Sequence, residues 1–133
     1  FAPATPPGFV DLSESYSNGE YRSTTADGMV LGVRAFPNKP AGEFAFWTKV
    51  VENRLRDTSG YALLETKDVK DRNGNAGKQL RFGHDESTVP HLYYLTIFVN
   101  EDHVYVLEAG GTKDLVTKHE QQIAWSIENF LPK

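Results

Sequence analysis

The residues best suited to chemistry lie together in one polar segment in the second half of the chain. His84, Asp85 and Glu86 follow one apolar run, and His91 precedes the next one. If residues 85–90 form a hairpin loop, His84 and His91 end adjacent antiparallel strands, with Cβ atoms about 4.5–5.5 Å apart. Two imidazoles and the Asp85 carboxylate at that distance could hold a divalent metal or transfer protons near neutral pH.

The competing interpretation of this segment is a solvated loop with polar tips, and we favour it. No Gly-x-Ser-x-Gly motif, and no other sign of a nucleophile with an oxyanion hole, accompanies the two histidines. We therefore expect a protein that is not an enzyme, with no catalytic residue, no metal and no cofactor. A small-ligand or metal-binding domain that uses His84, Asp85 and His91 is the alternative, and an enzyme built on the same cluster is the third hypothesis.

A second polar cluster has only part of a calcium-binding pattern. Asp71, Asn73 and Asn75 alternate along the chain as the ligands of a calcium loop do. The sixth and twelfth positions of such a loop should be Gly and Glu, but here they are Ala76 and Phe82. The cluster therefore predicts a hairpin turn.

The remaining polar candidates fit structural roles. Residues 110–112, Gly-Gly-Thr, have neither the Lys-Ser/Thr ending of a phosphate-binding loop nor a GxGxxG pattern, and the nearby Asp114 would repel a phosphate. They predict a strand-to-helix turn with Thr112 as the helix N-cap. His119 falls on the apolar stripe of the last helix, which predicts a core or boundary histidine, whereas His103 follows two acidic residues and is expected to be solvated.

Composition excludes several classes of function. The chain of 133 residues carries a net charge of −4, and its basic residues are scattered among acidic ones. A nucleic-acid-binding protein needs clustered Lys and Arg to neutralise phosphates, so we expect no nucleic-acid partner. The absence of Cys excludes thiol catalysis, thiolate zinc sites and disulfides. No apolar stretch approaches the roughly 20 residues that span a bilayer, so we expect no membrane insertion.

Turn residues and hydrophobic periodicity predict the elements that must position these side chains. An Asn18-Gly19 turn and an Asp27-Gly28 turn delimit an early hairpin, and clusters of polar residues separate the later strands. The expected strands are residues 21–25, 29–36, 61–70, 77–83, 91–99 and 103–109, with Gly110-Gly111 breaking the last one. The expected helices are residues 42–57 and 112–130.

The first helix presents an apolar stripe of Phe44, Trp47, Val51 and Leu55, and Val50 widens it. We expect Glu43 in its first turn and Gly60 as its stop signal.

The pattern of apolar residues predicts the architecture. Strands 91–99 and 103–109 are apolar on both faces, and a strand with this pattern is covered on both faces. Two helices and such a sheet predict an α+β fold, a three-layer α/β/α sandwich with a mainly antiparallel sheet of about six strands. An aromatic residue left exposed beside an apolar neighbour would mark a docking surface. Most of the aromatic residues are expected to lie in the core: Trp47, Tyr93, Tyr94, Phe98, Tyr105 and Trp125.

The order of these elements resembles a known fold superfamily. The Asp27-Gly28 hairpin leads to a long helix, then to the segments 60–65 (GYALLE) and 77–82 (GKQLRF), and the last strand ends in Glu-Ala-Gly-Gly at 108–111. This arrangement, over roughly residues 8–131, resembles the PsbP-like fold of photosystem II extrinsic subunits, Ran-nucleotide-release factors and DcrB-type bacterial lipoproteins. The resemblance implies a non-catalytic accessory module that binds a partner protein, and it supplies no site residues.

The start of the chain predicts a location. Residues 1–8 contain three prolines, so we expect a flexible, extended leader ahead of a single domain at residues 9–133. A Pro-rich leader before a Cys-free domain suits an exported bacterial protein, or a lipoprotein cut after an acylated Cys. We therefore expect a periplasmic or outer-membrane-anchored protein, with any lipid anchor carried by upstream residues.

Overall fold

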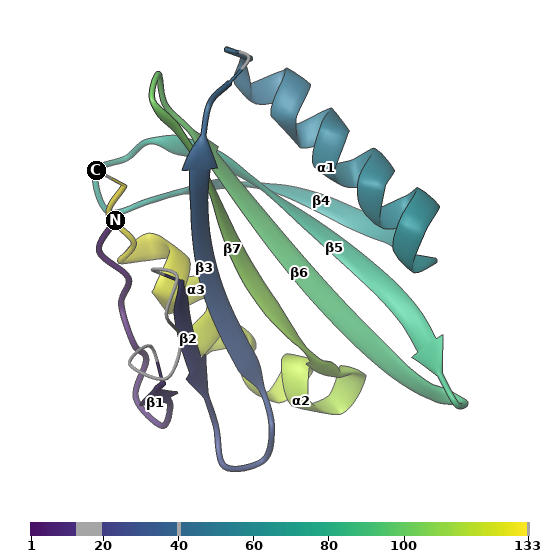
Figure 1. The fold of residues 1–133 in the computed structure, drawn as a ribbon. Helices are drawn as coiled ribbons and strands as arrows, with labels where there is room; N and C mark the ends of the chain where they lie inside the picture. Colours follow the sequence, from purple (N-terminus) through teal and green to yellow (C-terminus); the bar gives the residue numbers. More distant parts are fainter. Residues whose placement is uncertain (13–19, 40, 133) are drawn as a thin grey trace.

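The computed structural model describes residues 1–12, 20–39 and 41–132, and it shows an α+β fold built on one sheet (Figure 1). The Asn18-Gly19 turn lies outside the described residues. The strands are β1 (Val10–Asp11), β2 (Tyr21–Thr24), β3 (Val30–Pro37), β4 (Ala62–Lys70), β5 (Ala76–Glu86), β6 (Val89–Val99) and β7 (His103–Thr112). The helices are α1 (Phe44–Ser59), α2 (Lys113–Lys118) and α3 (Glu120–Glu128).

The sheet has seven strands in the order β1-β2-β3-β7-β6-β5-β4, and every neighbouring pair is antiparallel. The six predicted strands all form, and the meander β4-β5-β6-β7 is continuous. The predicted strand count is one too low, because β1 has only two residues and shows no alternation to detect. In the centre of the sheet, β3 pairs with β7 and so joins the early hairpin to the meander.

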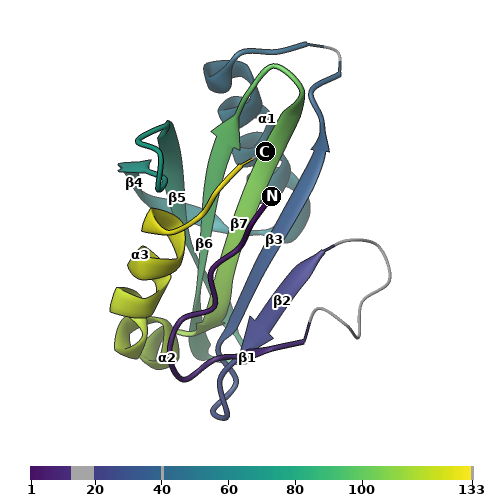
Figure 2. The same ribbon diagram turned by 90° about the vertical axis from the view of Figure 1, so that its left-hand side faces the viewer.

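Helices cover both faces of the sheet, as the doubly apolar strands predicted. Helix α1 lies on one face, and α2 with α3 lies on the other (Figure 2). Trp47 and Val51 of α1 pack on one buried cluster: Leu80, Phe82, Leu95, Ile97, Val104 and Val106. A second and larger cluster fills the other side and includes Val116, Ile123, Ile127 and Phe130 beside Tyr94, Phe98 and Tyr105.

The ends of the helices differ in part from the prediction. Gly60 ends α1 in the left-handed conformation, with φ of 67°, as predicted. Glu43 is the N-cap residue of α1 rather than a first-turn acid, and its side chain makes no capping bond. The expected single C-terminal helix is interrupted at His119, which ends α2 and precedes α3. Leu55 belongs to α1, but its side chain lies outside the described residues.

Three strands run further than their sequences suggested. β7 continues through Gly110 and Gly111 to Thr112, because both glycines keep their pairing with β6. β5 and β6 extend to Glu86 and Val89, so the proposed loop at 85–90 is wrong. Only Ser87 and Thr88 form that turn, both with positive φ, which is the backbone geometry of a tight two-residue hairpin.

The proline-rich leader packs on the domain, which corrects the prediction of a separate tether at residues 1–8. Phe1 lies 6.1 Å from Phe130 between ring centroids, and Pro6 is fully buried. Ala2 and Leu131 exchange backbone hydrogen bonds of 2.8 and 3.1 Å. The leader therefore contributes apolar surface to the larger core and brings the N- and C-terminal segments side by side.

Candidate functional site

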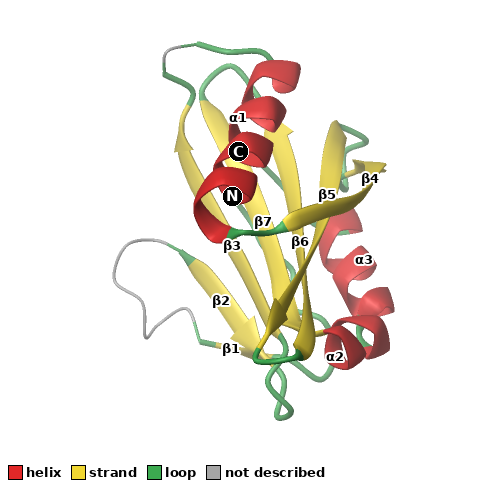
Figure 3. Cartoon of the chain, turned by 90° about the vertical axis from the view of Figure 1, so that its right-hand side faces the viewer, coloured by secondary structure: helices red, strands yellow, loops and turns green. Residues whose placement is uncertain are grey.

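The exposed apolar residues of α1 form a candidate docking surface. Phe46 is 49% exposed and Val50 is 39% exposed, and a spacing of four places them on one side of the helix. Trp47 packs inward, and its ring meets that of Phe46 edge to face at 5.2 Å between centroids. The buried stripe of α1 thus continues onto the surface, and we call Phe46 and Val50 the α1 surface (Figure 3 shows the helix from its outer side).

Asn38 fixes the start of α1 and therefore the position of the α1 surface. Its side chain is 7% exposed and makes four hydrogen bonds. Nδ2 donates to the carbonyl oxygens of Gly42 (3.1 Å) and Asn100 (2.9 Å). Oδ1 accepts from the Gly42 amide (2.9 Å) and from Trp47 Nε1 (2.6 Å). All the hydrogen-bonding capacity of the amide is used, and it ties α1 to the β6–β7 turn.

An ion pair between Arg34 of β3 and Glu108 of β7 lies on the same sheet face as α1. The Arg34 guanidinium lies 2.6 Å from Oε1 of Glu108, whose side chain is only 16% exposed. Burial, and then the negative charge and hydrogen bonding of Glu108, raise the pKa of Tyr93. Sequence reasoning missed Arg34 and Glu108, although a Glu directly after a doubly apolar run was a signal for a charge held against the sheet.

The structure brings His84 and His91 together but separates Asp85 from them. His84 pairs with His91 across β5 and β6, as predicted, and the His84 ring lies 5.1 Å from that of Tyr61. Asp85 pairs with Pro90, and successive residues of a strand point to opposite faces. The described residues contain no group of three His, Asp or Glu side chains placed to hold a metal ion. Two of the three proposed ligands therefore share a face, while the Glu86 side chain lies outside the described residues.

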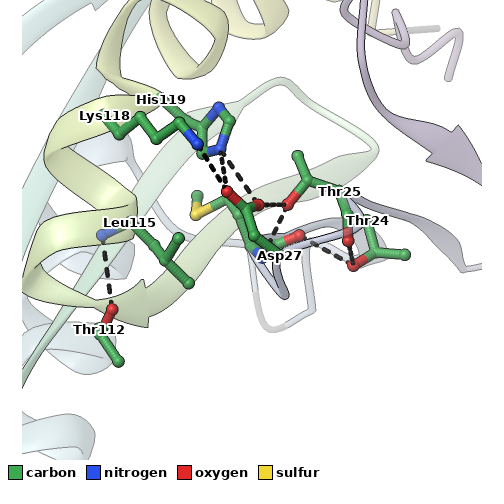
Figure 4. Close-up of polar contacts among 8 residues, drawn as sticks. Thr24, Thr25, Asp27, Thr112, Leu115, Lys118 and His119 are labelled. Atoms are coloured by element: carbon green, nitrogen blue, oxygen red, sulfur yellow. Dashed lines mark hydrogen bonds and ion pairs between the residues drawn. The ribbon is translucent and has the colours of Figure 1, made fainter.

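Asp27, in the turn between β2 and β3, contacts Thr25, Lys118 and His119 in one polar network (Figure 4). It accepts a hydrogen bond from the Thr25 hydroxyl, and Lys118 Nζ lies 2.9 Å from its other oxygen. His119 Nε2 lies 3.3 Å from Oδ1, and the ring of Phe9 packs edge-on against the imidazole at 5.7 Å. The Thr25 hydrogen bond, followed by Lys118, holds the pKa of Asp27 well below its usual range.

This network gives His119 a structural role, and the prediction of a boundary histidine is confirmed. Its side chain is largely buried at the break between α2 and α3. Sequence reasoning treated Asp27 only as a turn residue, because the contact joins segments 92 positions apart. His103 differs from its prediction, since Nδ1 is buried and has no hydrogen-bond partner in the part of the chain that the structure describes.

The Asp71 cluster is the hairpin turn that its sequence predicted. Oδ1 of Asp71 accepts from the backbone amides of Asn73 and Asn75, both at 2.9 Å, and Oδ2 accepts from Nδ2 of Asn75. Gly74 supplies the positive φ of the turn. The carboxylate is thus used to hold the turn rather than turned outward as a ligand. Thr112 likewise caps α2 by accepting from the Leu115 amide, as predicted.

The aromatic residues are mostly in the core, as predicted. Tyr94, Phe98 and Tyr105 are buried, and Trp47 and Tyr93 are half-buried. Trp125 on α3 is the exception at 40% exposure. It lies on the opposite side of the sheet from the α1 surface, so it supplies a position for a matched control. None of the described helices has the length and apolar character needed to cross a membrane.

Comparison with known proteins gives no relative by sequence. No protein-family model and no curated protein matches the chain. Solved structures do match it: PA94 from Pseudomonas aeruginosa, a protein of unknown function described as a candidate regulator, superimposes with a TM-score of 0.61 at 15% identity. The match covers 94% of this chain and 81% of PA94.

Two further structures support the same fold. The cyanobacterial PsbP protein CyanoP from Synechocystis sp. PCC 6803 matches with a TM-score of 0.56 and 13% identity, over 94% of this chain and 84% of CyanoP. LpqN, involved in cell envelope biogenesis of Mycobacterium tuberculosis, matches with the same TM-score and identity, over 96% of this chain and 79% of LpqN. Identities this low show the fold alone, and by that measure the chain has the PsbP-like fold that its sequence predicted.

Proposed function

We propose that the protein is a non-enzymatic accessory module that binds a partner protein through the α1 surface. The observation that carries this proposal is the exposure of Phe46 and Val50, one turn apart on a helix that is anchored at its start. Contiguous exposed apolar side chains on a small domain favour an interaction site. An aromatic anchor beside a half-buried Trp also suits the composition of protein interfaces.

The location that we propose is outside the cytoplasm of a bacterium, in the periplasm or at the outer membrane. Its support is the likeness in fold to LpqN, which is described as involved in cell envelope biogenesis. Secretion of a tagged full-length protein into the periplasmic fraction supports this location. Recovery of all of it with the cytoplasm contradicts it.

Site-specific photocrosslinking tests the docking role. A photoreactive phenylalanine analogue at position 46 should give one discrete adduct in cells, whereas the same analogue at Trp125 should give none. Replacing Val50 by Asp in the position-46 variant should abolish the adduct without changing the melting temperature. Equal adducts at both positions, or an adduct that persists with Val50→Asp, would show that the α1 surface is not the docking site.

A metal or small-ligand site at His84 and His91 is the second candidate function. Its support is their direct pairing across β5 and β6, which brings the two imidazoles to the same face of the sheet. Titration of zinc, copper or manganese should raise the melting temperature, since a metal at one hundred times its Kd adds about 2.7 kcal/mol. Loss of this shift in His91→Gln would assign it to the pair, and no shift at saturating metal would remove the candidate.

A further inference from the structure

The outer edge of β4 is the longest unpaired edge that the described sheet presents. β4 has nine residues and is the last strand of the sheet, hydrogen-bonded only to β5 among the described strands (Figure 1). All of its residues except Leu63 and Val69 are exposed. The opposite edge is reduced to the two residues of β1. An open edge of this kind is a template for pairing with another strand.

The side chains of β4 alternate between the two faces of the sheet. Glu65 and Lys67 lie on the α3 face, since Glu65 is opposite Arg81, which contacts Glu120 of α3. Thr66 lies on the α1 face, opposite the buried Leu80. A two-fold axis perpendicular to the sheet preserves the faces. Two copies paired through β4 must therefore place residues of the same face opposite one another.

One register places opposite charges across the axis. With Thr66 on the axis, Glu65 of each copy lies opposite Lys67 of the other, and Thr66 faces Thr66. Moving the register by two residues in either direction puts Glu65 against Glu65 or Lys67 against Lys67. Opposite charges directly across an antiparallel pair stabilise it and like charges destabilise it. The register with Thr66 on the axis also gives the two strands their greatest overlap.

Both charged groups are available for this pairing. Lys67 makes no ion pair with any residue that the structure describes, and it is exposed. Glu65 lies 3.7 Å from Arg81, but that guanidinium is closer to Glu120, at 2.9 Å. The bulge at Leu64 interrupts the register at one end, so the regular ladder is short and centred on Thr66.

A groove beside β4 gives a second reason for an occupant at this edge. It lies between α3 and strands β4 and β5 and has a volume of about 340 Å³. Its apolar wall is formed by Val69, Ile123, Ala124 and Ile127. A strand added to β4 would run along the mouth of this groove and cover part of that wall.

We propose that a second copy of this chain pairs antiparallel with β4, with Thr66 on the two-fold axis, so that one sheet continues through both copies. The partner is the chain itself because the charges of β4 complement themselves in the register with the greatest overlap. This surface is distinct from the α1 surface, so the dimer and the proposed docking role can fail separately.

The absence of Cys from the chain makes a direct test simple. Thr66→Cys places two thiols opposite each other on the axis, within reach of a disulfide or of a short bismaleimide cross-linker. Asp68→Cys is the matched control on the same face, because its two copies would lie about 14 Å apart in this register. We expect a covalent dimer from Thr66→Cys alone; equal cross-linking of both variants, or of neither, overturns the register.

Charge exchange tests the pairing without covalent chemistry. Lys67→Glu gives each copy two acidic positions, Glu65→Lys gives each copy two basic ones, and a mixture of the two variants restores every opposite-charge pair. Sedimentation should show a dimer for the unmodified chain, at least about tenfold weaker association for each variant alone, and recovery in the mixture. Unchanged melting of each variant would confirm that it is folded.

Three results would overturn the proposal. The first is an unmodified chain that stays monomeric at high concentration. The second is a dimer that both charge variants retain, which would place the interface elsewhere. The third is a mixture of the variants that does not associate, because the reciprocal charge pairs would then contribute nothing.

Discussion

Replacing Asn38 by Asp should destabilise the protein strongly, although it exchanges only the side-chain NH2 group for an oxygen. The substitution keeps an oxygen for the Gly42 amide and the Trp47 indole but removes both donors to the carbonyls of Gly42 and Asn100. Each lost hydrogen bond contributes about 1 kcal/mol, and the two buried carbonyls then face a carboxylate oxygen. We therefore expect a loss of about 3–4 kcal/mol in the free energy of unfolding.

For a chain of this length, that loss should lower the melting temperature by about 10–15 °C. Thermal unfolding followed by circular dichroism at pH 7 measures it. Asn53→Asp on the exposed side of α1 introduces the same charge and should change the melting temperature by less than about 2 °C. The deficit of Asn38→Asp should shrink in acid, since the protonated carboxyl again has a donor. A shift no larger than that of Asn53→Asp would refute the account of how α1 is anchored.

The remaining predictions concern ionisation and packing. Because the pKa of Asp27 is depressed in the folded state, its contribution to stability is lost as pH falls below about 4. The difference in melting temperature between the unmodified chain and Asp27→Asn should therefore shrink below that pH and vanish in stronger acid. Burial raises the pKa values of Tyr93 and Tyr94, so the folded protein resists their ionisation and loses stability above about pH 10. An absorbance titration should show these two phenols ionising only as the protein unfolds. Gly77→Ala would drive a Cβ into the Phe98 ring and should destabilise the protein by about 1–3 kcal/mol in urea unfolding.

The architecture could be predicted because it depends on local patterns. Strands apolar on both faces require two covering layers, and the doubly apolar segments 91–99 and 103–109 lie in the centre of the sheet, as that rule demands. The end of α1 could be predicted from Gly60 alone, because glycine tolerates the positive φ of a helix end. The end of β7 was predicted wrongly by the same type of argument, since Gly110 and Gly111 are held in the ladder by β6.

The candidate sites were harder to predict because they depend on contacts between distant segments. The pairing of His84 with His91 followed from a short hairpin, but the opposite orientation of Asp85 required the strand to continue past it. The ion pair of Arg34 with Glu108 joins positions 74 residues apart, and no local pattern signals such a partner. The exposure of Phe46 could not be read from periodicity, because it flanks a stripe that is itself buried.

The pairing of β3 with β7 has a consequence for the order in which the molecule folds. The two strands are central in the sheet, yet their paired residues are 66 to 80 positions apart, from Pro37 with His103 to Val30 with Gly110. Contacts between such distant positions form only after the intervening chain has been ordered, which slows folding. The meander from β4 to β7 can form by local steps, while the early hairpin must wait for it. During synthesis β3 therefore stays without its partner until β7 has left the ribosome.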